Sequence, residues 1–194
     1  MERPVLYQGE KWDFEVRQYV WGWRRNARTV FVKQVDSLNG LRVYYMRELI
    51  PSFVPDPLPW TIVRDSDLNA VAYLDPRNER VLKANVSSFS WPLFVGREWK
   101  VDGQDELRQL SFYGRAKVEK YEIVATKAGT FRAFVVEIKG RLVDQTTGHS
   151  YSFSEIYWWA PEVKNYVRYE INWGSSWFLN VNGELIDYAL KDDK

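Results

Sequence analysis

The sequence contains no cysteine, and it has only one histidine among its 194 residues. Without cysteine there are no disulfide bonds, no thiolate catalysis and no cysteine-ligated metal. With His149 as the only imidazole, a zinc site would need mostly carboxylate ligands, which suit zinc poorly. His149 falls in the polar stretch 144–149, so we expect an exposed turn residue and not the base of a catalytic triad. We therefore expect no metal and no cofactor.

Long apolar runs, helical periodicity and an excess of one charge are missing as well. No segment approaches the roughly 18 apolar residues of a membrane-spanning helix, and none keeps a 3.6-residue apolar period. The formal net charge of +1 gives no field that would attract nucleic acid. Residues 1–4 lack the basic start of a signal peptide. We expect an export signal, and with it any membrane anchor, to lie upstream of this sequence in the gene.

Aromatic residues are abundant, at 16% of the chain, with ten tryptophans and twelve tyrosines. Aromatic and β-branched residues gather in short segments separated by turn signals, a pattern typical of antiparallel β proteins. The proline-rich stretch 51–60 interrupts them and predicts an irregular connection. We predict an all-β fold for residues 1–194, as a single β domain with little helix. Its architecture would be a single curved antiparallel sheet or a half-open β-barrel.

The alternation of apolar and polar residues predicts individual strands. They cover residues 9–19, 28–35, 41–48, 61–64, 70–74, 80–86, 106–113, 115–124, 131–138, 151–159 and 166–171. Both faces of 131–138 are largely apolar, which favours a central strand covered on both sides. We also expect a turn at 102–105 and a last hairpin that turns on Asn182 and Gly183, because Asn-Gly favours positive φ.

Three motifs in the second half of the chain carry a family resemblance. They are PLFVGREW at 92–99, TKAGTFRA at 126–133 and YWWAPEV at 157–163, followed by ELIDY at 184–188. They resemble the PL-x-VG-x-x-W, T-x-AGTF-x-A and WYAPE elements of β-rich exported proteins of unknown function from Gram-negative bacteria, many of them lipoproteins. The resemblance implies a strongly curved antiparallel sheet in a periplasmic or outer-membrane-associated protein, and it implies no reaction. The lipid-attachment cysteine of that group is absent from this sequence.

Seven tryptophans fall in or beside predicted turns. Tryptophan at loop ends stacks on sugars, lines apolar grooves or seats at membrane interfaces, whereas the alternative here is that the indoles fill the ends of a barrel. We predict a non-enzymatic cell-envelope protein whose aromatic-lined groove binds a small apolar molecule, a glycan or an envelope protein. The groove candidates are Trp21, Trp23, Trp60, Trp91, Trp99, Trp173 and Trp177.

Three glutamates support a second hypothesis, a carbohydrate-active hydrolase. Glu137, Glu155 and Glu170 lie on strands that we expect to be neighbours, and two inward carboxylates a few ångströms apart suffice for glycoside hydrolysis. The alternative for these residues is ion pairing with arginines on a wet sheet face. A third hypothesis is a structural subunit of an envelope assembly.

Overall fold

The computed structural model describes residues 1–19, 23–38, 40–49, 61–75, 80–174 and 180–191. Nearly all of them lie in strands or in the turns between strands. The strands are β1 (Lys11–Tyr19), β2 (Trp23–Leu38), β3 (Leu41–Leu49), β4 (Thr61–Arg64), β5 (Ala70–Leu74), β6 (Val81–Lys83), β7 (Glu98–Asp105), β8 (Leu110–Thr126), β9 (Gly129–Asp144), β10 (Ser150–Ala160), β11 (Asn165–Trp173) and β12 (Val181–Ala189). One 3-10 turn, η1 (Pro161–Val163), follows β10 and begins at the proline that ends the strand.

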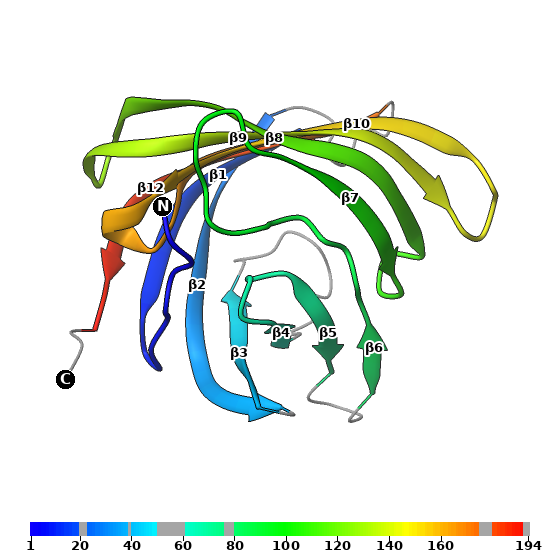
Figure 1. The fold of residues 1–194 in the computed structure, drawn as a ribbon, viewed down its shortest axis with the longest axis horizontal. Coiled ribbons are helices and arrows are strands. Elements are labelled where there is room, and N and C mark those ends of the chain that lie inside the picture. Colours follow the sequence, from blue (N-terminus) through cyan, green and yellow to red (C-terminus); the bar gives the residue numbers. More distant parts are fainter. Residues whose placement is uncertain (20–22, 39, 50–60, 76–79, 175–179, 192–194) are drawn as a thin grey trace.

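All strands form one antiparallel sheet in the order β6-β5-β4-β3-β2-β1-β12-β11-β10-β9-β8-β7. Figure 1 shows the sheet curving round until its two edge strands, β6 and β7, approach each other. A bridge between Ala84 and Asp105 joins these edges, and the backbone N–H of Asn85 donates to the carbonyl of Gln104 at 3.0 Å. The sheet is therefore nearly closed into a barrel, which confirms the predicted all-β class.

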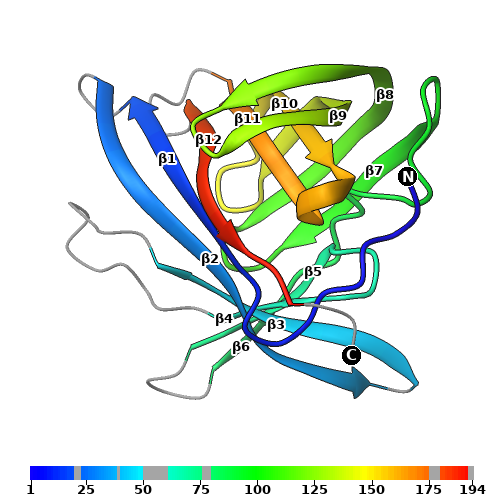
Figure 2. The same ribbon diagram turned by 90° about the vertical axis from the view of Figure 1, so that its left-hand side faces the viewer.

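Irregular strand pairing bends the sheet. A β-bulge places an extra residue on one strand and locally increases its twist and curvature. The pairing register shifts at Asp13/Phe14, Val32/Gln34, Val63/Arg64, Val118/Lys120 and Trp158/Trp159. Figure 2 shows the long β8–β9 hairpin reaching across to β12, where the N–H of Ala128 donates to the carbonyl of Leu185 at 3.2 Å. The tip of this hairpin thus contacts β12, which is not its neighbour in the strand order, and the ring of Phe131 lies 6.0 Å from that of Tyr188.

A core of large aromatic side chains fills the inside of the ring. Trp12, Phe14, Tyr44, Trp159 and Tyr169 are each no more than 2% exposed, and they come from four strands around the sheet, β1, β3, β10 and β11. Burying rings of this size contributes much of the stability of a β protein, because each removes a large apolar area from water. The core lies where the inner faces of opposite strands meet.

An irregular segment, residues 85–96, contributes to this core and is called the crossing segment below. Figure 1 shows it running across the ring on the way from β6 to β7. Its side chains Val86, Phe89 and Leu93 are buried. The indole N–H of Trp99 donates to the carbonyl of Ser88 at 3.3 Å, which ties the segment to β7. The inside of the barrel is thus occupied by the protein's own chain.

Two predictions for the stretch after this segment are wrong. The predicted turn at 102–105 lies inside β7, and the predicted strands 106–113 and 115–124 are replaced by a turn and the single long strand β8. Gly103 looked like a turn residue, but it lies at the seam of the barrel. A Cβ at Gly103 would come within 2.3 Å of the carbonyl oxygen of Asn85, so the glycine permits the close approach of the two edges.

The predicted hairpin on Asn182 and Gly183 is also wrong, because both residues lie within β12. A Cβ at Gly183 would lie 2.0 Å from the ring of Tyr169, so this glycine makes room for a core side chain and not for a turn. The prediction for 131–138 is confirmed. These residues belong to β9, which pairs with β8 and β10, and Ala133 and Val136 are fully buried although they lie on opposite faces.

Candidate functional site

Seven aromatic rings meet inside the barrel and form what we call the inner aromatic cluster. The ring of Trp159 lies 5.0 Å from that of Phe89, 5.3 Å from that of Trp91 and 5.5 Å from that of Tyr166, each nearly edge to face. Such contacts suit the charge distribution of aromatic rings. The members of the cluster are Phe14, Phe89, Trp91, Tyr157, Trp159, Tyr166 and Tyr169.

Regular alternation along β10 places Trp159 in this cluster, and a bulge on β11 places Tyr166 beside it. Glu155 and Tyr157 point inward on β10, and strict alternation would then turn Trp159 inward and Trp158 outward. Trp158 pairs with Arg168 and Trp159 with Tyr166, so Val167 is the extra residue on β11. The bulge brings Tyr166 to the inner side as well, next to the ring of Trp159.

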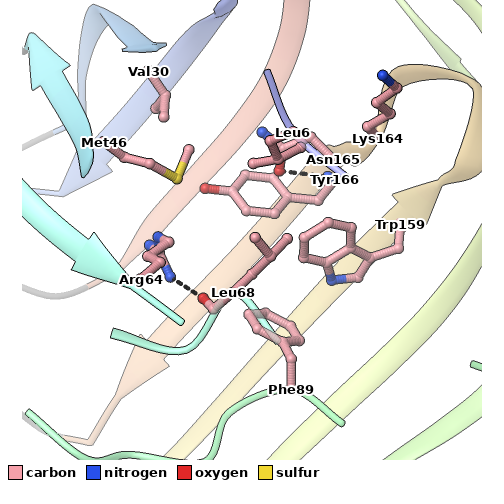
Figure 3. A pocket seen from close by; sticks show the side chains of 10 residues that line it. All are labelled: Leu6, Val30, Met46, Arg64, Leu68, Phe89, Trp159, Lys164, Asn165 and Tyr166. Carbon is pink, nitrogen blue, oxygen red and sulfur yellow. Dashed lines mark hydrogen bonds between the residues drawn. The ribbon is translucent and has the colours of Figure 1, made fainter. Parts of the chain in front are cut away.

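A cavity opens beside the cluster. Figure 3 shows its walls, which come from β2, β3, β4, β11, the end of β10, the crossing segment and the N-terminal residues. The empty volume of the cavity is about 340 Å³ when the space open to solvent is included. The part of it in which the centre of a water molecule can lie is only about 20 Å³. That is room for about one ordered water. The lining residues are Leu6, Val30, Met46, Arg64, Leu68, Phe89, Trp159, Lys164, Asn165 and Tyr166.

The indole N–H of Trp159 is the unusual polar group of this cavity. Trp159 is 2% exposed, and its Nε1 has no hydrogen-bond acceptor among the described residues. Figure 3 shows this nitrogen on the side of Phe89 and Leu68, two apolar walls of the cavity. A buried donor left without an acceptor costs about 1–3 kcal/mol. Inside the cavity this donor therefore faces the apolar side chains of Phe89 and Leu68.

Two cations line the mouth of the cavity. Arg64 Nη1 donates to the carbonyl oxygen of Leu68 at 2.6 Å, the bond drawn in Figure 3. Lys164 Nζ lies 3.0 Å from the fully buried carboxylate of Glu10 and 4.7 Å from the ring centre of Tyr7. Lys164 is thus neutralised by an ion pair, whereas Arg64 is held by a neutral carbonyl group.

A buried carboxyl group lies behind the cluster. Glu155 accepts hydrogen bonds from the hydroxyl of Tyr157 at 2.8 Å and from the indole N–H of Trp173 at 2.7 Å. Burial raises the pKa of Glu155, and these two hydrogen bonds only partly oppose the effect. Burial and the neighbouring Glu155 charge raise the pKa of Tyr157 well above its usual value. A proton is therefore held inside the barrel more tightly than in water.

An arginine at the seam lies near this group. The guanidinium of Arg108 lies over the rings of Tyr73, at 5.6 Å, and Trp173, at 5.9 Å. It donates to the hydroxyl of Tyr73 at 2.7 Å and forms an ion pair with Asp105. The hydroxyl of Tyr73 also donates to Asp105 at 2.9 Å. Because Tyr73 lies on β5 and Asp105 on β7, these contacts fasten the two edges of the sheet to each other.

Three of the predicted groove tryptophans can be placed, and each is engaged in holding the fold together. Trp91 donates to the carbonyl of Asp67 at 3.0 Å, Trp99 to that of Ser88 and Trp173 to the carboxylate of Glu155. Of these three, Trp91 belongs to the inner aromatic cluster. Trp21, Trp60 and Trp177 lie outside the described residues, and Trp23 begins β2 with a side chain that is likewise outside the description.

The three predicted carboxylates do not converge. Glu137 and Glu170 both flank Ile156 and lie on the outer face of the sheet, whereas Glu155 points into the core. Each outer glutamate pairs with a cation two residues away on its own strand, Glu137 with Lys139 at 2.7 Å and Glu170 with Arg168 at 2.9 Å. The ion pairs therefore run along strands and not across them.

Other candidate chemistry is sparse in the described part of the chain. His149 is exposed in the turn between β9 and β10, where its backbone N–H donates to Thr147. Within the described ranges no group of three histidine, aspartate or glutamate side chains could hold a metal ion. Over the same ranges, no helix has the length and apolar character needed to cross a membrane.

Sequence reasoning missed Trp159, Arg64 and Lys164, three of the polar residues that line the cavity. Trp159 is the next-to-last residue of β10, and the search for turn-proximal indoles passed over it because it falls within the predicted strand 151–159. Arg64 is the last residue of β4, and Lys164 follows η1 in a left-handed conformation. Only the curvature of the closed sheet brings these positions together, and no local pattern records it.

Comparisons with known proteins give a likeness in fold. No protein-family model matches the sequence, and no curated protein sequence matches it. Two solved structures are similar: a candidate exported protein with a YmcC-like fold from Bacteroides fragilis and a candidate lipoprotein from Parabacteroides distasonis. Each has a TM-score of 0.54 and 13% sequence identity over 97% of this chain, and 99% and 98% of those chains are covered. The chain thus shares its fold with proteins described as exported or as lipoproteins, as the resemblance implied.

Proposed function

We propose that this protein is a non-enzymatic binding protein of the bacterial cell envelope that takes an apolar ligand into the cavity beside Trp159. One observation carries the proposal: a buried indole N–H, without an acceptor among the described residues, faces an open cavity whose walls are largely apolar. Ligand sites are mostly apolar with a few placed polar groups, and this cavity has that composition. The ligand would supply an acceptor, such as a carbonyl or carboxylate oxygen, to Trp159.

The size of the cavity sets a condition on binding. One ordered water fills the present space, so a larger ligand requires a wall to move. The walls formed by Phe89 and Leu6 belong to irregular segments and not to paired strands. Irregular segments open at lower free-energy cost than the strands of a sheet. We propose that the crossing segment or the N-terminal residues shift to admit the ligand.

The envelope location is supported by the fold that this chain shares with proteins described as exported or as lipoproteins. A hydrolase acting through Glu137, Glu155 and Glu170 has less support, because Glu155 is buried on the inner face while Glu137 and Glu170, on the outer face, are each paired with a cation. Retaining and inverting glycosidases need two carboxyl groups facing one substrate. A structural subunit of an envelope assembly would be separated from our proposal by co-purification with stoichiometric protein partners.

Displacement of a fluorescent apolar probe from purified protein tests the proposal, with Trp159→Phe as the variant. The substitution keeps an aromatic ring but removes the donor, so we expect the affinity for acceptor-bearing ligands to fall about 5-fold, the effect of one hydrogen bond of about 1 kcal/mol. Trp158→Phe is the matched control, because Trp158 is the adjacent residue and its N–H donates to Glu122 at 2.9 Å. Absence of probe binding, or an equal loss in both variants, would refute the proposal.

A further inference from the structure

The charges at the mouth of the cavity define the class of ligand. On the basis of the proposed function, we infer that the ligand is a single-chain amphiphile with an anionic head, whose carboxylate or phosphate is bound by Arg64. Its acyl chain lies along the apolar walls beside the inner aromatic cluster. The inference rests on how Arg64 is held, on its position relative to Trp159, and on the chemistry of the walls between them.

Arg64 has charge available for a ligand. Its guanidinium donates one hydrogen bond, to the neutral carbonyl oxygen of Leu68, and among the described residues no carboxylate lies within 4 Å of it. The adjacent Asp65 attracts Arg64 without forming an ion pair, because its carboxylate accepts the backbone N–H groups of Asp67 and Asn69, both at 2.9 Å. A guanidinium presents several donors in a plane that matches a carboxylate or phosphate.

Lys164, the other cation of the mouth, has a different role. The carboxylate of Glu10 neutralises it at 3.0 Å, and the same carboxylate also accepts the backbone N–H groups of Tyr7 and Lys191. This arrangement fastens the N-terminal residues to the turn after η1. One of the two cations is therefore part of the framework, whereas Arg64 forms no ion pair among the described residues.

The walls of the cavity favour a hydrocarbon chain over a sugar. Its lining includes five apolar side chains, those of Leu6, Val30, Met46, Leu68 and Phe89. A glycan would need several polar partners for its hydroxyl groups, and a buried hydroxyl without a partner costs roughly 1–3 kcal/mol. Each buried methylene group of a chain, in contrast, contributes about 0.8 kcal/mol.

Binding of four C12 amphiphiles to the full chain tests this inference. The ligands are laurate, dodecyl phosphate, neutral dodecanol and cationic dodecylamine, measured by probe displacement at low and high salt. We expect the anionic ligands to bind at least 10-fold more tightly than the neutral one, and we expect added salt to reduce this preference. The ranking of laurate against dodecyl phosphate identifies the preferred head, and either order supports the inference.

Arg64→Gln is the decisive variant. Hydrogen bonds to charged groups contribute more than neutral ones, so we expect about a 10-fold or greater loss of affinity for the anionic ligands and no change for dodecanol. Arg64→Lys retains the charge and should restore part of the affinity, which guards against a variant that simply folds poorly. Arg115→Gln, an arginine on β8 with a 78% exposed side chain, is the matched control and should bind like the wild type.

The outcomes separate this inference from the proposed function. If dodecanol and the anions bind equally and Arg64→Gln changes neither, the anionic head is refuted while an apolar ligand site remains. If no amphiphile binds to the wild-type protein, both fail, and Trp159 is satisfied by a single water. Tighter binding of dodecylamine than of laurate would likewise overturn the role of Arg64.

Discussion

At the scale of single residues, the barrel interior holds an acidic group in an unusual setting. Glu155 is buried and receives two hydrogen bonds, from Tyr157 and Trp173, and burial raises its pKa above the ordinary value. The folded state therefore binds the proton of Glu155 more tightly than the unfolded state does. By linkage, the stability conferred by the protonated group is fully present below the unfolded pKa of about 4.5, and it is lost as the pH rises through the higher folded pKa.

Glu155→Gln tests this linkage. Glutamine keeps an oxygen for the indole N–H of Trp173 but carries no titrating group, so we expect the decline in stability above pH 4.5 to become shallower. Urea unfolding of the wild type and the variant between pH 4 and pH 8 measures the effect. Glu137→Gln on the outer face should keep the wild-type slope. A variant with the wild-type slope at position 155 would show that Glu155 does not titrate across this range.

At the scale of elements, the crossing segment has two roles. Phe89 fills the ring and forms one wall of the cavity, at 5.2 Å from the ring of Tyr157 and 5.0 Å from that of Trp159. The segment is joined to β7 by backbone bonds at its start, including Ser87 N–H to the carbonyl of Asp102 at 3.1 Å. The segment is also held in its middle and at its far end, because Asn69 hydrogen-bonds the backbone N–H and carbonyl of Phe89 at 2.8 and 3.0 Å and the N–H of Gly96 donates to the carbonyl of Val118 at 2.8 Å.

Phe89→Ala should enlarge the cavity at the expense of the core. Removal of a buried phenyl ring typically costs about 3–5 kcal/mol in the free energy of unfolding. Because the lost ring lines the cavity, we expect tighter binding of an apolar probe despite the lower stability. Phe112→Ala is the control: Phe112 is similarly buried but packs on Phe153 and Trp173. Equal effects of the two variants on probe binding would contradict the assignment of the cavity.

The local pattern of the chain predicts some of these elements well and others poorly. β4 and β5 begin and end at the predicted residues, because turn-forming residues bound each short apolar run. β7 and β12 were interrupted in the prediction by Gly103 and Gly183. Both glycines resemble turn residues in the sequence, but each is needed for a close contact with a distant part of the chain, Asn85 or Tyr169. Such contacts have no signature in the neighbouring residues.

At the scale of the whole molecule, the aromatic content predicts an all-β chain, but it does not predict which buried indole N–H group lacks a hydrogen-bond acceptor. The predicted groove tryptophans Trp91, Trp99 and Trp173 all have hydrogen-bond acceptors, whereas Trp159 near the end of β10 has none among the described residues. The difference depends on the closure of the sheet, which brings distant parts of the chain around each indole. The curved barrel in the sequence-based prediction is confirmed, while the site inside it could only be found from the structure.

The indole N–H resonances of the protein, recorded in two-dimensional ¹H–¹⁵N spectra during a laurate titration, test the central claim most directly. The Trp159 signal is identified by its loss in Trp159→Phe. We expect the Trp159 signal to shift in a saturable way as its N–H gains an acceptor. The Trp158 signal should stay in place, because the Trp158 N–H already donates to Glu122. A saturable shift of other indoles with Trp159 unchanged, or no shift at all, would contradict a ligand site beside Trp159.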